Sequence, residues 1–256
     1  MSQPSQPHAA AHAPAAPEAP LDLREKGGAK DGVPQFCDRR LFMQLTAFSG
    51  CRDPHQLLGA LGGSGVDCVL YEELNDPRGV AVLAMSEDPA LLASKLRRDL
   101  CTGPFAELTV KPEFSMLGRT YSLGYEPKLE DWLLHRPRRV VSDPAAPWAI
   151  WYPLRRTGAF SRLPKAEQGQ ILKEHGIIGR RFGDAGLASD IRLACHGLDK
   201  NDNDFVIGLI GKDLFPLSAL VETMRPTVQT SQYLQNLGPF FVGRAIWRTP
   251  HKEANL

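Results

Sequence analysis

The order in which strand and helix patterns follow one another constrains the fold of this chain more than any other feature. The first half carries them in the order 41–48 (strand), 54–61 (helix), 66–72 (strand), 80–85 (strand), 89–101 (helix) and 108–116 (strand). The second half repeats that order at 148–154 (strand), 165–181 (helix), 191–196 (strand), 205–210 (strand), 217–224 (helix) and 240–247 (strand). Each half therefore has the order of a ferredoxin-like unit. We predict an α+β fold in which two ferredoxin-like halves form a dimeric α+β barrel.

The composition of the remaining segments suggests the domain boundaries. Residues 1–34 are rich in Ala, Pro, Gly and charge and have no period that could bury a face, which predicts a disordered tail. The N-terminal half then spans residues 35–117 and the C-terminal half residues 147–248. Residues 118–146 are expected to form an ordered connector, in which Arg138 and Arg139 belong to a basic, proline-containing stretch.

Charge and cysteine content argue against several classes of partner. The formal net charge of the 256 residues is +1, so no overall positive field favours nucleic acid. The five cysteines are scattered and contain no CxxC pair, which indicates neither a disulfide framework nor a zinc site. No run approaches the roughly 20 apolar residues of a membrane span, and the N-terminus lacks the pattern of a signal peptide. We therefore expect a cytoplasmic protein.

His175 is the first candidate for a site residue. It lies towards the end of the predicted helix, after the apolar residues Ile171 and Leu172, and Gly176 after it leaves room for a flat ligand. A neutral imidazole in such a place can bind haem iron through one nitrogen while a neighbouring group orients the other. A helix cap or a satisfied core histidine would look the same in sequence. His196, near a predicted strand end, is a competing candidate that also suits a strand edge.

Two motifs together resemble the haem-binding half of the chlorite dismutase-like family. They are Trp151-Tyr152-Pro153-Leu154-Arg155-Arg156 and Glu174-His175-Gly176-Ile177-Ile178-Gly179-Arg180. Tyr-Pro followed by basic residues is most similar to the coproheme decarboxylase branch, and weaker likeness extends over residues 148–243. Those enzymes make haem b from iron coproporphyrin III by oxidatively removing the carboxyl groups of two propionates, with hydrogen peroxide as oxidant. The resemblance implies haem or coproheme as cofactor and a homo-oligomer, commonly a pentamer.

The resemblance also implies roles for two residues. His175 stands where the family has its iron ligand. Tyr152 stands where a tyrosine next to the porphyrin passes an electron and a proton to the oxidised iron, which leaves a phenoxyl radical able to take hydrogen from a propionate. Without the resemblance, Tyr152 would be a strand tyrosine with a buried ring and a wet hydroxyl.

Basic and hydroxyl side chains are candidates for holding the propionates. Arg156 replaces a lysine that those enzymes carry four residues after the tyrosine; it can hold a carboxylate in a bidentate manner, although arginine cannot release a proton as lysine can. Arg155 is a second cationic candidate, on the other strand face, and either arginine could instead form a surface ion pair. Ser231 and Thr230 lie near where family members contact a propionate, and could also cap a loop.

The residue on the second, distal side of the porphyrin depends on the alignment register. Counting back from Gly197-Leu198-Asp199 selects Asp190, whereas aligning the strand by His196 selects Arg192. The fixed charge of a distal Arg192 could polarise an oxyanion or peroxide, which favours chlorite or peroxidase chemistry. The leading hypothesis is a coproheme decarboxylase, with chlorite dismutase, haem peroxidase or a non-catalytic haem-binding protein as alternatives.

Overall fold

The computed structural model describes residues 20–250, and in this part of the chain eight antiparallel strands form a closed barrel. Their order around the barrel is β7 (Trp148–Arg156), β11 (Phe241–Arg248), β4 (Asp67–Glu73), β5 (Val80–Ser86), β3 (Phe42–Ser49), β6 (Thr109–Thr120), β8 (Ser189–Ala194) and β9 (Phe205–Gly211). Pairing of β9 with β7 closes the ring. Each half has the ferredoxin-like strand order second, third, first, fourth, so the expected barrel is confirmed. A short strand, β10 (Leu234–Leu237), extends the pairing along the end of β7.

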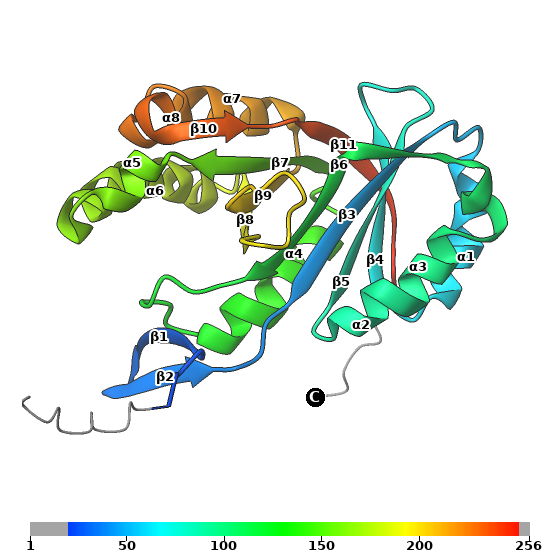
Figure 1. Ribbon diagram of the computed structural model, residues 1–256. Helices are drawn as coiled ribbons and strands as arrows, with labels where there is room; N and C mark the ends of the chain where they lie inside the picture. Colours follow the sequence, from blue (N-terminus) through cyan, green and yellow to red (C-terminus); the bar gives the residue numbers. More distant parts are fainter. Residues whose placement is uncertain (1–19, 251–256) are drawn as a thin grey trace, which may run out of the picture.

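Two groups of helices lie on opposite sides of the barrel (Figure 1). The first group contains η1 (Pro54–Leu57), α1 (Leu58–Gly63), α2 (Pro89–Leu91), η2 (Leu92–Leu96), α3 (Arg97–Leu100) and η3 (Gly103–Glu107). The second group contains α5 (Gly158–Arg162), α6 (Lys165–Asp184), α7 (Leu214–Met224) and α8 (Val228–Tyr233). Among the helices within residues 20–250, none combines the length and the apolar character needed to cross a bilayer.

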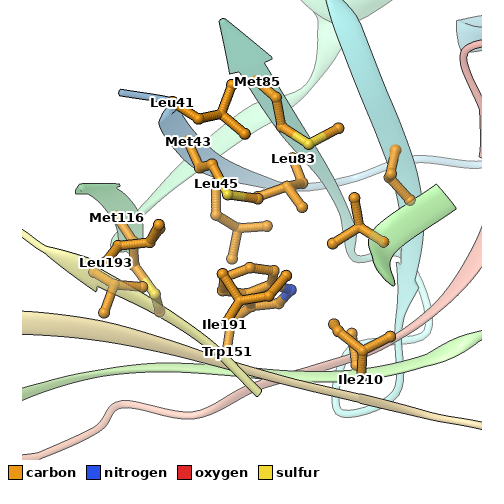
Figure 2. Close-up of a cluster of buried hydrophobic side chains, with 14 of the residues drawn as sticks. Leu41, Met43, Leu45, Leu83, Met85, Met116, Trp151, Ile191, Leu193 and Ile210 are labelled. Atoms are coloured by element: carbon orange, nitrogen blue, oxygen red, sulfur yellow. The ribbon is translucent and has the colours of Figure 1, made fainter. Parts of the chain in front are cut away.

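Alternating side chains give each strand an inner and an outer apolar face. The inner faces of both halves meet inside the barrel, where Met43, Met116 and Trp151 converge with leucine and isoleucine side chains (Figure 2). The outer face of the N-terminal half packs against the first helix group, and that of the C-terminal half packs against α6 and α7. The fold thus contains three apolar layers, and β7 contributes to two of them.

Trp151 determines which residue its neighbour on β9 can be. It is fully buried and lies opposite Gly208 in the β7–β9 register. A Cβ atom at position 208 would stand 2.5 Å from two carbons of the indole ring. The strand pair that closes the barrel therefore accommodates the indole because residue 208 has no side chain.

The connector contributes to the core. Within residues 118–146, a π-helical turn (η4, Asp131–His135) leads into α4 (Arg136–Ser142), and Pro137 lies at the junction, where it cannot donate a backbone hydrogen bond. Leu133 and Leu134 are fully buried in the barrel cluster. Arg138 and Arg139 pair with Asp67 and Asp131 at 3.1 and 2.6 Å, so the protein's own carboxylates occupy this basic stretch.

The prediction of disorder through residue 34 is wrong for residues 25–34. β1 (Glu25–Lys30) and β2 (Val33–Cys37) form a hairpin, whose two-residue turn has positive φ at Asp31 and Gly32 as an Asp-Gly hairpin turn requires. Gln35 fastens it to the connector by donating Nε2 to the carbonyl oxygens of Glu126 and Pro127 at 3.2 and 3.0 Å. The Asp-Gly signal is in the sequence, but the flanking strands are short and largely exposed. Residues 1–19 lie outside the described residues.

Substitution of Gly208 tests the closure of the barrel. We expect Gly208→Ala to lower the free energy of unfolding by about 1–3 kcal/mol, because the added methyl group overlaps the Trp151 indole in a packed interior. The measurement is urea unfolding followed by circular dichroism. Gly59→Ala is the matched control: its methyl group would enter open space on α1, so it should be neutral or stabilising. Equal stability of the two variants would contradict this account of the closure.

Candidate functional site

The candidate site lies on the outer face of the C-terminal half, between β7 and the helices α6 to α8. Ile150, Tyr152 and Leu154 alternate along this face of β7 and form a buried cluster with Leu217 and Leu220 of α7. Ile178 and Phe182 of α6 pack against the same cluster. Arg156 continues the series on β7, so one polar cation follows a row of apolar side chains.

His175 lies inside α6, which continues to Asp184. The helix thus extends slightly beyond the predicted range 165–181, and the alternative in which His175 caps the helix is wrong. Its Nδ1 lies 3.5 Å from Thr227 Oγ1, a weak contact that orients the ring towards the start of α8. The preceding Glu174 accepts a hydrogen bond from the backbone nitrogen of Val228 at 3.0 Å, which ties α6 to α8.

The surroundings of His175 keep its imidazole neutral. Burial above all, and then the positive charges of Arg156 and Arg192, lower the pKa to about 4, against the opposing effects of Asp190 and Glu174. Arg156 and Arg192 are therefore close enough to His175 for their charges to act on its imidazole. A neutral imidazole is the form that binds a metal ion, so the electrostatics suit a ligand role.

Tyr152 is buried with its ring against Phe240. The ring centroids are 4.7 Å apart, and 6% of the residue is exposed. Burial raises the pKa of the phenol well above its usual value, and the charge of Asp190 adds to this effect. Among the described residues, none forms a hydrogen bond with the hydroxyl, and the hydroxyl oxygen is not fully enclosed. The phenol is thus protonated, and its hydroxyl keeps its hydrogen-bonding capacity unused among the described residues.

Arg156 and Arg155 have opposite surroundings. The Arg156 guanidinium lies over the rings of Phe160 and Phe205, at 4.9 and 4.6 Å, and its Nε is buried without a hydrogen-bond partner among the described residues. Burial lowers its pKa from the usual value, because the charged form has lost water. Arg155 points to the other face of β7 and pairs with Asp202 at 2.6 Å. The structure therefore brings Arg156, and not Arg155, to the face that carries Tyr152.

A pocket of about 190 Å³ borders the Arg156 end of this face. Phe160, Phe205, Lys165 and His196 are among the residues that line it. His196 lies 3.4 Å from Asp204 through Nδ1 and edge-on to Phe205. His196 thus lies on the rim beside Arg156, at a strand end, and has its own acidic partner.

Asp190 and Arg192 both project from the outer face of β8, because Ile191 and Leu193 point into the barrel. Asp190 and Arg192, the candidates selected by the two alignment registers, therefore lie on the same surface. Arg192 Nε pairs with Asp190 at 3.0 Å, and its guanidinium lies over the Trp132 ring at 5.3 Å. Asp190 also pairs with Arg136 at 3.3 Å, so one carboxylate is shared by two guanidinium groups.

Sequence reasoning missed two aromatic residues of the site. Tyr121 stacks on Phe205 at 5.6 Å, and its pKa is raised by burial against the effects of Arg192 and Arg156. Trp132 lies beneath Arg192 and donates Nε1 to the Tyr121 carbonyl oxygen at 3.1 Å. Both belong to the connector region, whose sequence has no periodic pattern that points to the C-terminal sheet.

The hydroxyl groups of Ser231 and Thr230, the candidates for propionate binding, form hydrogen bonds within the first turn of α8. Ser231 is exposed and donates Oγ to the Thr227 carbonyl oxygen at 2.8 Å. Thr230 Oγ1 accepts from Thr227 Oγ1 at 3.2 Å, and Thr227 is the residue beside His175. Gln229, between these residues, is buried with its Oε1 lacking a partner among the described residues. At the start of α8, Thr227 is thus the polar residue shown next to His175.

Comparisons with known proteins agree with this architecture. The model of the family described as "Chlorite dismutase" matches residues 84–246. Three solved structures are similar. A candidate chlorite dismutase has a TM-score of 0.65 and 14% sequence identity, with 82% of this chain and 96% of that chain covered. A haem-binding protein from Thermus thermophilus has a TM-score of 0.63 and 18% identity, with 81% and 91% covered, and chlorite dismutase from Candidatus Nitrospira defluvii in complex with imidazole has a TM-score of 0.64 and 14% identity, with 81% and 92% covered. At these identities, the structures establish the shared fold.

The low pKa of His175 predicts a specific dependence of stability on pH. The pKa is about 4 in the folded protein against 6.5 ordinarily, so between these values the unfolded chain binds more protons. The contribution is fully present above pH 6.5 and is lost as the pH falls towards 4. After a discount for partial exposure it is on the order of 2 kcal/mol.

We expect acidification from about pH 7 to about pH 4 to lower the free energy of unfolding less in His175→Gln than in the wild type. Urea unfolding at a series of pH values measures this difference. His55→Gln removes an exposed histidine outside this site and should keep the wild-type dependence. Parallel curves for His175→Gln and the wild type would show that His175 is not held neutral by its surroundings.

Proposed function

The chain belongs to the chlorite dismutase family, and from this premise we propose that it binds iron coproporphyrin III and converts it to haem b by peroxide-dependent oxidative decarboxylation. The observation that carries the proposal is the pair Tyr152 and Arg156 on one face of β7, together with a neutral His175 whose pKa is lowered by the charge of Arg156. In the proposal, a phenol, a carboxylate-binding cation and an imidazole act together beside the apolar layer between β7 and α6.

The residues present fit an iron porphyrin. The apolar side chains of β7, α6 and α7 suit a flat apolar ring, and the neutral imidazole of His175 suits an iron ion. Arg156 has a buried Nε without a partner among the described residues, which is costly unless an acceptor arrives. A propionate carboxylate is such an acceptor, and it would restore the balance of charge around this buried cation.

Each residue has a separate task in the proposed reaction. When bound, an iron porphyrin treated with peroxide supplies an oxidising centre that takes an electron and a proton from a neighbouring phenol. Tyr152 gives up this hydrogen, since burial keeps its phenol protonated, and recovers one from the propionate chain. Loss of carbon dioxide and of a second electron leaves a vinyl group, so each propionate consumes one peroxide and yields two waters. Arg156 holds a carboxylate, and His175 would hold the iron.

The pairing of Arg192 favours this reaction over chlorite chemistry. A distal arginine stabilises an oxyanion when its charge is free, but Arg192 is engaged by Asp190 at 3.0 Å and lies over Trp132. We therefore propose that Arg192, held by Asp190, adjusts the electrostatic potential on the distal side of the porphyrin. Chlorite dismutation or peroxidase turnover remains the alternative, for which release of Arg192 from Asp190 would be required. We further propose a cytoplasmic homo-oligomer, such as a pentamer.

The decisive experiment mixes the purified chain with iron coproporphyrin III, adds hydrogen peroxide stepwise and follows the products by mass spectrometry. Two successive losses of one carboxyl group each, with vinyl products, are expected. Tight binding with intact propionates would overturn the decarboxylase proposal. In that case, oxygen release from chlorite or oxidation of a peroxidase dye would identify the alternatives, and neither activity would leave a non-catalytic haem-binding protein.

Replacement of Tyr152 separates chemistry from binding. We expect Tyr152→Phe to bind iron coproporphyrin as the wild type does and to decarboxylate it about 10²-fold or more slowly, because the ring remains and the transferable hydrogen is lost. Absorbance titration and product analysis measure the two properties. The control His175→Ala should instead alter the Soret band of the bound porphyrin. Full decarboxylation by Tyr152→Phe would remove this residue from the mechanism.

The two neighbouring arginines provide a matched test of propionate binding. Arg156→Gln should weaken the binding of iron coproporphyrin by about tenfold to a hundredfold, as expected for loss of a charged hydrogen bond. Arg155→Gln removes a cation one residue away that is paired with Asp202 on the other face of β7, and should leave the affinity unchanged. Equal effects of the two substitutions would indicate general electrostatic attraction.

A further inference from the structure

A second pocket, of about 340 Å³, lies away from His175 and Tyr152, on the outer surface of the barrel. It is lined by Cys51, Arg52, Pro54, Glu72, Glu73, Leu74, Pro77, Arg78, Gly79, Val80, Trp148 and Arg244. These residues come from the corner after β3, the β4–β5 turn, β11 and the start of β7. The volume falls in the range of sites for small molecules.

The pocket occupies the seam between the two helical layers. Along the outer face of β11, Val242 packs with the C-terminal layer and Ile246 with the N-terminal layer. Arg244 lies between them and is exposed. The seam therefore leaves this part of the sheet uncovered by helices, while Trp148 and Glu72 flank Arg244 in the strand registers.

The walls of the pocket are held by hydrogen bonds. The backbone nitrogen of Cys51 donates to the Arg78 carbonyl oxygen at 3.0 Å, and that of Leu74 donates to the Val242 carbonyl oxygen at 2.8 Å. Asp76 closes the β4–β5 turn by accepting from Ser49 Oγ and the backbone nitrogen of Arg78, at 2.8 and 2.9 Å. The three segments that carry the arginines are thus tied together before any ligand binds.

The charge of the pocket is unbalanced. Glu73 is buried and pairs with Lys111, 2.7 Å away, which also lies 3.3 Å from Asp76. In the described part of the chain, the guanidinium groups of Arg52, Arg78 and Arg244 have no ion pair or hydrogen bond, and Glu72 is the remaining acid of the lining. Three cations gathered around one hollow, with a single free acid, attract a multivalent anion.

We propose that this pocket binds a small molecule that carries two or more carboxylate or phosphate groups. Guanidinium groups match both chemistries through paired N–H donors, and Trp148 supplies an aromatic wall for the body of such a ligand. The proposal is independent of the proposed porphyrin reaction, since the two sets of residues share no member.

The test is calorimetric titration of the purified full chain, without porphyrin, with pyrophosphate and with citrate. Binding of either probe is expected, and the stronger one identifies phosphate or carboxylate as the preferred chemistry. The dissociation constant should rise about tenfold or more in Arg244→Gln, and less in Arg244→Lys, which keeps the charge without the paired donors. Arg97→Gln, an exposed arginine on α3, should bind as the wild type does.

Three results would overturn the proposal. They are failure of both probes to bind, equal affinity of Arg244→Gln and the wild type, and an equal loss of affinity in Arg97→Gln. Circular dichroism and size-exclusion chromatography accompany each variant, because an altered oligomeric state in Arg244→Gln would assign the surface to contact between copies of the chain. Decarboxylation of iron coproporphyrin is measured separately, so failure here leaves that activity untouched.

Discussion

The pairing of β7 with β9 is the interaction on which the rest of the structure depends. It is the central strand pair of the C-terminal ferredoxin-like sheet, whose outer strands β11 and β8 join β4 and β6 of the N-terminal sheet, and it orients the two faces of β7. Trp151 fills the interior because Gly208 opposite it has no side chain, which sends the next residue, Tyr152, to the outer face. A shift of one residue in this register would exchange the two faces and place the tyrosine inside the barrel.

Burial controls the chemistry of the outer face. In the apolar layer beneath α6, loss of water favours neutral forms: His175 stays unprotonated and Tyr152 stays protonated. Arg156 remains the cation of this layer whose Nε is buried without a partner among the described residues, whereas Arg192 and Arg155 form ion pairs with Asp190 and Asp202. The difference between paired and unpaired guanidinium groups separates residues that stabilise the fold from the residue proposed to hold a ligand.

Exposure to solvent likewise determines the character of the seam between the two helical layers, beside Trp148. Two helical layers cover two parts of the barrel surface, and the strand residues between them remain open to solvent. At Arg244 this opening coincides with arginines from two turns, so a basic hollow arises where layers meet. Such a place arises from the arrangement of the two halves, and neither half contains it alone.

The alternation of apolar residues was sufficient to predict the barrel, because a period of two or 3.6 residues reports directly which face of an element is buried. Likewise, the motifs around Tyr152 and His175 identified the strand and helix that form the candidate site. The hairpin at residues 25–37 escaped prediction, since its strands are short and mostly exposed and its fastening to the connector joins residues about 90 positions apart in sequence.

By itself, the sequence determined the order of the elements, the ferredoxin-like repeat and the facing of Tyr152 and Arg156 to one side, because these depend on contacts within a strand or helix. Only the tertiary structure decided that Asp190 and Arg192 share a surface, that Tyr121 and Trp132 join the site from the connector, and that Arg244 stands in an uncovered seam. The physical reason is that pairing of charges and loss of water depend on neighbours from distant segments, which no local pattern records.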